Sequence, residues 1–161
     1  LVGRNKWFDA FGRAGGEIII VFSVAWFLIS TFLKFYPEKI AIFMPIAFLG
    51  LFWFLGLGIN QLIGLLVKEP RPQVMNREIK LLFEPISKKS FPSDHALAAF
   101  LIFFMALIFE LPFLGVLLVF ALWICWGRIY CGVHYPLDIV GGFLMAGLMG
   151  VVAWYIYLLV F

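Results

Sequence analysis

The chain of 161 residues is 65% hydrophobic and only 13% charged, whereas a typical soluble domain is about half apolar and about a quarter charged. This composition excludes an ordinary water-soluble domain and indicates an integral membrane protein. Because each spanning helix needs about 20 residues, the length suits one bundle and leaves little over for a second domain. We therefore expect a single membrane-embedded, all-α domain over residues 1–161, a polytopic bundle of about five or six transmembrane helices.

The first segment, residues 1–16, mixes charged side chains such as Arg4 and Asp9 with aromatic ones such as Trp7 and Phe11. It lacks the continuous apolar core and cleavage site of a secretory signal. The mixture of charge and aromatic character predicts an N-terminal helix lying in the membrane interface.

Five stretches without charged residues are candidates for crossing the membrane. They are Ile18–Leu33, Ile40–Val67, Ala96–Phe109, Leu111 to about Trp126, and Ile139–Phe161.

The connector between the second and third stretches, residues 68–94, is the one sizeable polar segment. Apolar side chains recur in it at near-helical spacing among basic ones, which predicts an additional interfacial helix. These apolar residues are Val74, Ile79, Leu82, Phe83 and Ile86.

Polar residues gather in three clusters at the ends of the predicted spans. They are "KEPRP" (Lys68–Pro72), "SFPSDHA" (Ser90–Ala96), and a spaced set formed by Arg128, His134 and Asp138. Following the chain through the membrane places all three clusters on one side. Because charged groups near a bilayer are costly unless they pair or line a functional cavity, we expect the clusters to form one site.

The residue types in these clusters suit an anion of concentrated charge, above all a phosphate, because arginine donates two parallel hydrogen bonds to phosphoryl oxygens. The clusters hold no cysteine nucleophile and no obvious carboxylate cage for a metal. The two cysteines, Cys125 and Cys131, fit neither a zinc pattern nor a disulfide framework, so we interpret them as small apolar packing residues.

Taken in order, "RP" at Arg71, "PSDH" at Pro92–His95 and the Arg-x5-His-x3-Asp pattern from Arg128 to Asp138 resemble the three signatures of the type 2 phosphatidic acid phosphatase superfamily. The resemblance covers roughly residues 64–142. It implies an enzyme, a metal-independent lipid phosphate phosphatase with no cofactor. Its partners would be a lipid phosphate or diphosphate and the membrane lipids, and we expect no nucleic-acid partner.

The resemblance also implies catalytic roles. His134 would be the nucleophile that forms a phosphohistidine, and Asp138 would fix the tautomer and orientation of its imidazole. His95 would protonate the leaving oxygen and then activate the water that cleaves the intermediate.

Four residues would bind the phosphate: Arg71, Arg128, Ser93 and, less directly, Lys68. In the usual first signature a lysine precedes the arginine by seven residues, but this chain has Gly64 at that position. Lys68 lies one helical turn further along, and its long stem could reach the same ligand.

The second signature commonly has glycine where this chain has Asp94. A carboxylate beside a bound phosphate repels it, so we expect Asp94 to face a cation or to turn away from the site. We expect Asn60 and Gln61 to form interhelical hydrogen bonds. Several lysines at the ends of spans are interpreted as interfacial anchors. They are Lys34, Lys39, Lys88 and Lys89.

Resemblance to short bacterial members with "PSDH" favours undecaprenyl diphosphate as substrate, cleaved to the monophosphate that carries cell-wall precursors. Phosphatidylglycerol phosphate, phosphatidic acid and lipid A 1-phosphate remain alternatives. Two rival functions are a small transporter whose charges line an ion path and a binding protein that holds a lipid phosphate without turnover.

The resemblance implies a multi-pass protein of the cell (inner) membrane with its active site facing outward. The basic residues argue the other way, because ten of them fall on the active-site side and two on the other, and basic loops usually stay in the cytoplasm. Some of these cations would serve the substrate phosphate, so we follow the resemblance and expect an extracytoplasmic site.

Overall fold

The computed structural model describes residues 2–3, 5–76, 78–85 and 89–160. Over these residues the secondary structure is helical, with no strand. The elements are α1 (Lys6–Arg13), the π-helix η1 (Ala14–Ile18), α2 (Ile19–Phe35), α3 (Lys39–Val67), α4 (Pro72–Met75), α5 (Asp94–Ile108), α6 (Leu114–Tyr130) and α7 (Pro136–Val160).

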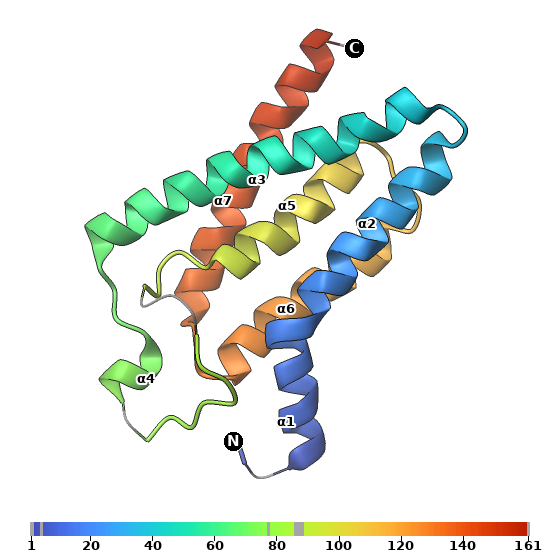
Figure 1. The fold of residues 1–161 in the computed structure, drawn as a ribbon. Coiled ribbons are helices and arrows are strands. Elements are labelled where there is room, and N and C mark those ends of the chain that lie inside the picture. The colour runs from blue at the N-terminus through green and yellow to red at the C-terminus, as the bar shows by residue number, and fades with distance from the viewer. Residues whose placement is uncertain (1, 4, 77, 86–88, 161) are drawn as a thin grey trace.

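Helix α5 is the centre of the bundle, with α2, α3, α6 and α7 packed around it (Figure 1). Its side chains at Leu97, Leu101 and Met105 are fully buried. They face Phe27 of α2 and Phe52 of α3 in one continuous apolar core. The first turn of α5 therefore lies in the middle of one end of the bundle, with the other helices around it.

Short-range signals fix the helix ends that carry the polar clusters. The hydroxyl of Ser93 caps α5 by accepting a hydrogen bond from the backbone N–H of Ala96, at 3.4 Å. Helix α3 ends at Lys68, which has the left-handed φ of 53° that commonly terminates a helix. Pro136 opens α7, where its missing N–H costs no helical hydrogen bond.

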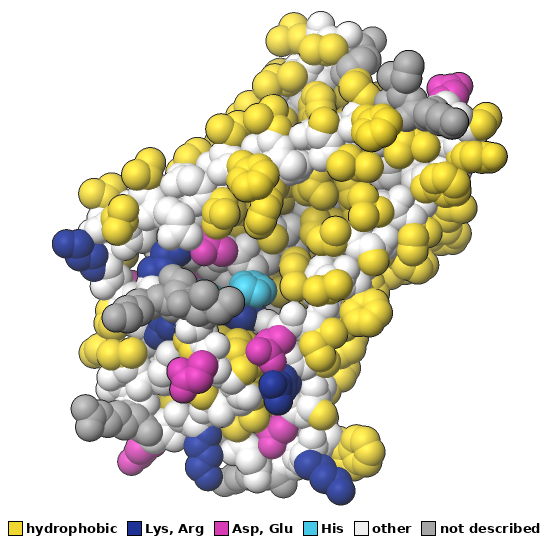
Figure 2. All heavy atoms as spheres, in the orientation of Figure 1, with side chains coloured by type: hydrophobic (Ala, Val, Ile, Leu, Met, Phe, Trp, Pro, Cys, Tyr) yellow, Lys and Arg dark blue, Asp and Glu magenta, His cyan; other side chains and the backbone are white. Residues whose placement is uncertain are grey.

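The surface divides into an apolar body and a polar end. Hydrophobic side chains cover most of the bundle, and charged and histidine side chains gather near the connector (Figure 2). Among the described residues, three helical stretches are long and apolar enough to cross a membrane, Lys6–Phe35, Ala41–Val67 and Pro136–Val160, while α5 and α6 are shorter apolar helices. Exposed side chains such as Leu66, at 83%, suit contact with lipid. The prediction of an all-α, multi-pass membrane bundle is confirmed.

Helices α1 and α2 join end to end through η1, with a bend at that junction (Figure 1). A π-helical turn is a recognised cause of such bends. The ring of Phe11 stacks on Trp123 of α6, with centroids 4.3 Å apart. The segment predicted to lie in the interface is thus anchored to the bundle and continuous with the first spanning helix.

The prediction of a second interfacial helix in the connector is wrong. Among the described residues of that segment only α4 is helical, and it has four residues. The apolar side chains pack separately: Ile79 lies against Gly132, and Phe83 lies against Gly16. Ile86 lies outside the described residues. The near-helical spacing of Ile79 and Phe83 therefore reflects two separate anchoring points on the bundle, one at Gly132 and one at Gly16.

Candidate active site

A cavity of about 340 Å³ lies at the polar end of the bundle, between the connector and the ends of α5 and α6. Four of the predicted site residues line it, and four further charged residues, Glu17, Glu84, Lys89 and Asp94, join them. The lining residues from the three sequence clusters, with Lys89 directly before the second cluster, are Arg71, Lys89, Asp94, His95, Arg128 and His134. The expectation that the three sequence clusters meet is confirmed for these residues, which are separated by up to 63 positions in the sequence.

His134 is held from one side by Asp138. The two lie in the turn before α7 and in its first turn, and the imidazole Nδ1 is 3.2 Å from the carboxylate Oδ2. The same oxygen accepts hydrogen bonds from the hydroxyl of Ser90 at 2.6 Å and from the N–H of Tyr135 at 2.8 Å. Asp138 is fully buried. Its carboxylate therefore favours the tautomer with hydrogen on Nδ1 and leaves the Nε2 lone pair available.

Burial lowers the pKa of the His134 imidazole below its usual range, and the hydrogen bond with Asp138 opposes this shift only in part. Arg128 and Arg71 lower the pKa further because their positive charges repel an imidazolium. His134 is consequently neutral near pH 7, which is the form in which a nitrogen can act as a nucleophile.

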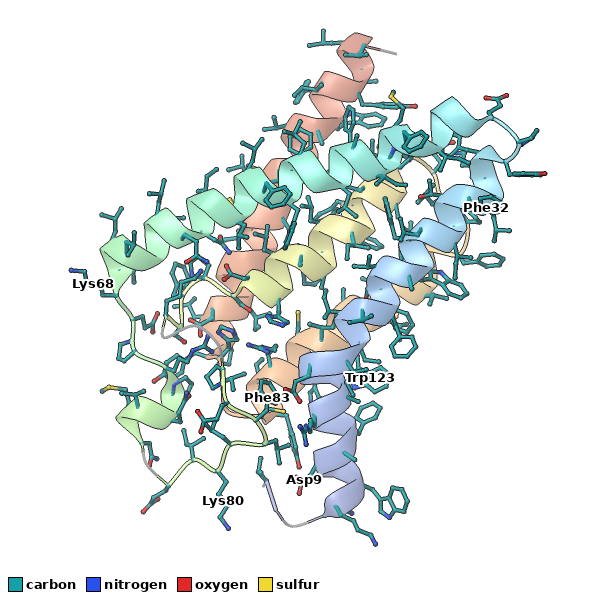
Figure 3. All side chains as sticks on the ribbon, in the orientation of Figure 1. Asp9, Phe32, Lys68, Lys80, Phe83 and Trp123 are labelled. Atoms are coloured by element: carbon teal, nitrogen blue, oxygen red, sulfur yellow. The ribbon has the colours of Figure 1, made fainter. Side chains whose placement is uncertain are left out.

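Arg128 ends the last turn of α6 and is only 4% exposed. Its Nη1 donates to the carbonyl of Gly16 at 2.9 Å, and its Nη2 lies 3.4 Å from Nε2 of His134. The guanidinium also lies over the ring of Phe83, 5.2 Å from its centroid. Three separate segments thus fix this guanidinium beside Nε2 of His134, which accepts from Arg128 in the tautomer with hydrogen on Nδ1. Figure 3 shows Phe83 directed from the connector toward this region.

Arg71 follows the end of α3 and precedes α4, and it is also 4% exposed. Its Nη1 donates to the carbonyl of Val133, directly before His134, at 2.6 Å. Burial lowers the pKa of the Arg71 guanidinium, and the carboxylates of Asp138 and Asp94 oppose the shift. Because a guanidinium stays charged in proteins, the cavity holds two buried positive charges next to His134.

His95 lies in the first turn of α5, half-buried, and lines the same cavity. It comes from the central helix, whereas His134 comes from the turn before α7. The cavity is thus bounded by two imidazoles on independent elements, as expected for a nucleophile and a separate proton donor.

Two of the predicted phosphate-binding residues do not line this cavity. Ser93 is fully buried as the cap of α5, and its backbone N–H donates to the carbonyl of Asp138 at 3.0 Å. Lys68 is exposed at the end of α3 and points away from the bundle (Figure 3). The structure gives Lys68 no geometric support as a phosphate ligand.

Asp94 does face a cation, as expected. Its carboxylate pairs with Lys89 at 2.8 Å and accepts hydrogen bonds from the side-chain amides of Asn60 at 3.0 Å and Gln61 at 3.2 Å. The interhelical role predicted for these two amides, between α3 and α5, is also confirmed.

Sequence reasoning missed Glu17, Glu84, Lys89 and Ser90 at this site. The sequence marks Ser90 only as a member of its cluster, yet its hydroxyl donates to the Asp138 carboxylate. The sequence predicts Lys89 as an interfacial anchor, yet it lines the cavity. The sequence feature that points to Lys89 is Gly64. Where the signature lysine is missing, another cation nearby is a candidate for the same role.

Gly127 stands where the third signature often has serine, and its role is steric. A Cβ at this position would lie 2.5 Å from the backbone nitrogen of Gly16 and 2.8 Å from the carbonyl oxygen of Gly12. Helix α6 and the N-terminal helix therefore touch backbone to backbone. This close approach brings the Gly16 carbonyl within reach of Arg128.

Comparison with known proteins agrees with this geometry. Over 106 residues the chain is 36% identical to undecaprenyl-diphosphatase BcrC of Bacillus subtilis, covering 65% of this chain and 54% of that protein. Over 105 residues it is 36% identical to human sphingosine-1-phosphate phosphatase 2, covering 60% of this chain and 26% of that protein. The chain thus spans about half the length of the first relative and about a quarter of the second.

Among solved structures, LpxE of Aquifex aeolicus superposes with a TM-score of 0.74 and 26% identity, covering 94% of this chain and 87% of that one. The family model of the PAP2 superfamily matches residues 45–160, which include α5, α6, α7 and the entire connector. The matched region therefore holds every polar residue that lines the cavity except Glu17. The chain belongs to the PAP2 superfamily.

Proposed function

We propose that this protein is a membrane lipid phosphatase that works through a phosphohistidine intermediate on His134. The observation that carries the proposal is the buried imidazole held between a carboxylate and a guanidinium, with Nδ1 3.2 Å from Asp138 and Nε2 3.4 Å from Arg128. A neutral nitrogen beside fixed positive charge suits attack on phosphorus, since the cations stabilise the phosphoryl oxygens.

In the first step, Nε2 of His134 attacks the terminal phosphorus, and the bond from phosphorus to the leaving oxygen breaks. The guanidinium groups of Arg71 and Arg128 neutralise the charge on the three equatorial oxygens. His95 donates its proton to the leaving oxygen, so that the lipid alcohol or lipid monophosphate departs without an extra charge.

In the second step, a water attacks the phosphohistidine from the side vacated by the leaving group. His95, now neutral, accepts the proton of that water, and the nitrogen–phosphorus bond breaks to release inorganic phosphate. His134 returns to its neutral form with Nδ1 still bonded to Asp138. The chain's own residues supply every proton transfer, and this chemistry predicts turnover in EDTA.

The proposed substrate is undecaprenyl diphosphate. The name of the Bacillus subtilis relative favours it, at 36% identity. The human relative is named for a different lipid phosphate, sphingosine-1-phosphate. Phosphatidylglycerol phosphate, phosphatidic acid and lipid A 1-phosphate are therefore tested as alternative substrates in the same assay.

The test is phosphate release by the detergent-purified protein, in EDTA, from these four lipids. His134→Ala is the inactive control, and the exposed Lys68→Ala is the matched control that leaves the cavity intact. EDTA-resistant release that His134→Ala abolishes supports the enzyme. Binding of a lipid phosphate without any release would favour the non-catalytic binding protein, and release that survives in His134→Ala would defeat the mechanism.

We further propose that the cavity faces outward. Lys80 is exposed on the connector and points away from the bundle (Figure 3). Lys80→Cys, in a chain with Cys125 and Cys131 replaced, should react with an impermeant maleimide in intact cells. Protection from the reagent would place the site in the cytoplasm, as the basic residues suggest.

A further inference from the structure

We propose that Lys89 is a third phosphate-binding cation of the active site and that it replaces, from the connector, the lysine that α3 lacks at position 64. This inference rests on the proposed phosphatase function and names a residue outside the three sequence signatures.

The first argument is steric. A Cβ placed on Gly64 would lie 2.5 Å from Cδ of Lys89 and 3.3 Å from the carbonyl oxygen of Phe91. The stem of Lys89 therefore crosses α3 at Gly64, in the space that any side chain there would occupy. A side chain at position 64 would therefore displace the Lys89 stem from its present path.

The second argument is the position of the ammonium group. The Lys89 side chain is only 12% exposed, and its Nζ donates to Asp94 at 2.8 Å. Two longer contacts reach the carbonyl oxygens of Pro92 at 3.3 Å and Asn60 at 3.5 Å. Phosphate oxygens can replace these two weak acceptors while the short bond to Asp94 remains.

The third argument concerns the charge of Asp94. Its carboxylate is shared among Lys89 and the amides of Asn60 and Gln61, so neutral donors satisfy part of it. The carboxylate takes one donor of the ammonium group and thereby orients it. Asp94 is then a positioning residue, which explains why an acidic side chain is tolerated at the edge of a phosphate site.

The fourth argument compares the two lysines near the end of α3. Lys89 lines the cavity together with Arg71, Arg128 and His134. Lys68 is exposed at the left-handed end of α3 and points away. A site that binds a diphosphate gains from a third cation next to two buried guanidiniums, and Lys89 is placed to supply it.

The experiment compares Lys89→Met, which keeps the apolar stem over Gly64 but removes the charge, with Lys68→Ala. Lys89→Met should lower kcat/KM about 10- to 100-fold and weaken inhibition by inorganic phosphate by a similar factor, as expected for a lost charged hydrogen bond. Lys68→Ala should change both by less than about twofold.

The double variant Gly64→Lys, Lys89→Ala moves the lysine back to α3 and should recover at least about a tenth of the wild-type kcat/KM. A lysine that only locks the loop would lower the melting temperature without changing phosphate inhibition, and that result would overturn the inference. Equal losses from both single lysine variants would also overturn it.

If the wild-type protein releases phosphate from none of the lipids, the proposed function fails, but the inference is still tested by binding. Broadening of the ³¹P signal of inorganic phosphate should then depend on Lys89 and not on Lys68. Phosphate binding unchanged in Lys89→Met would reject the role of this residue independently of turnover.

Discussion

The carboxylate of Asp138 offers the sharpest test of the mechanism. Asp138→Asn keeps the size of the side chain and removes only its charge. In the native protein Oδ2 accepts hydrogen bonds from Ser90 at 2.6 Å, from the N–H of Tyr135 at 2.8 Å and from His134 at 3.2 Å. An asparagine oxygen can still accept from these donors, so the fold should survive.

The magnitude follows from the 3.2 Å separation between Nδ1 of His134 and Oδ2 of Asp138. At an effective dielectric constant of about 20, unit charges at this distance interact by about 5 kcal/mol. In the proposed mechanism the imidazole gains positive charge as it is phosphorylated, so this attraction would act mainly in the transition state and the intermediate. Because 1.36 kcal/mol is a factor of ten, kcat should fall by about 10³- to 10⁴-fold.

The assay is phosphate release from the preferred lipid, with KM and the thermal melting curve measured on the same preparations. Glu110→Gln is the matched control, because it makes the same chemical change on a side chain 85% exposed in the connection between α5 and α6. The control should retain wild-type turnover. An Asp138→Asn enzyme within tenfold of wild type would refute the assignment of Asp138 as the group that orients and stabilises His134.

Three further predictions use other contacts of the same region. Ser90→Ala removes a buried 2.6 Å hydrogen bond to the Asp138 carboxylate, which also contacts the His134 imidazole. Under the proposed mechanism it should lower kcat by about tenfold or more at an almost unchanged KM, and an unchanged kcat would contradict the positioning role. Gly142→Ala places a Cβ 2.5 Å from a backbone oxygen at the start of α5 and should cost about 1–3 kcal/mol of stability, seen as a lower melting temperature in detergent. Gly147→Ala, which has no atom within 4 Å of its Cβ, should leave the melting temperature unchanged. Equal melting temperatures for the two variants would show that the helices can separate to make room. His95→Gln leaves His134 as the one histidine of a chain that has two, and its imidazole carbon signals should titrate with a midpoint below 6.5 because burial disfavours the charged form; a midpoint above 6.5 would contradict a neutral nucleophile.

The spanning helices could be predicted from sequence because their signal is local. Charge-free runs of sufficient length mark each one, and the observed α3, at Lys39–Val67, nearly coincides with the predicted Ile40–Val67. Helix α5 begins two residues before the predicted start at Ala96, because its cap is Ser93 and Asp94 belongs to its first turn. Such capping decides ends that hydrophobicity alone leaves open.

The conformation of the connector and the placement of Lys89 in the cavity could not be predicted, because both depend on contacts between residues that are distant in the sequence. The spacing of Ile79 and Phe83 predicts a helix, but each side chain packs on a glycine of another element. From the sequence alone, Lys89 is interpreted as an interfacial anchor. Its stem lies against α3 at Gly64, which has no side chain and lies 25 residues earlier in the chain.

The π-helical turn η1 has a consequence for the evolution of this chain. A π turn differs from an α turn by one extra residue, and the carbonyl that binds Arg128 belongs to Gly16, within that turn. Because the π turn absorbs one extra residue, deleting one residue between positions 14 and 18 would straighten the junction to regular α-helix and keep the preceding helix roughly in phase. The direction of α1 would change, and the stacking of Phe11 on Trp123 and the contact between Gly12 and Tyr130 depend on that direction. A deletion in this short segment should therefore perturb the contact between Gly16 and Arg128 more than a substitution on its lipid-facing side does.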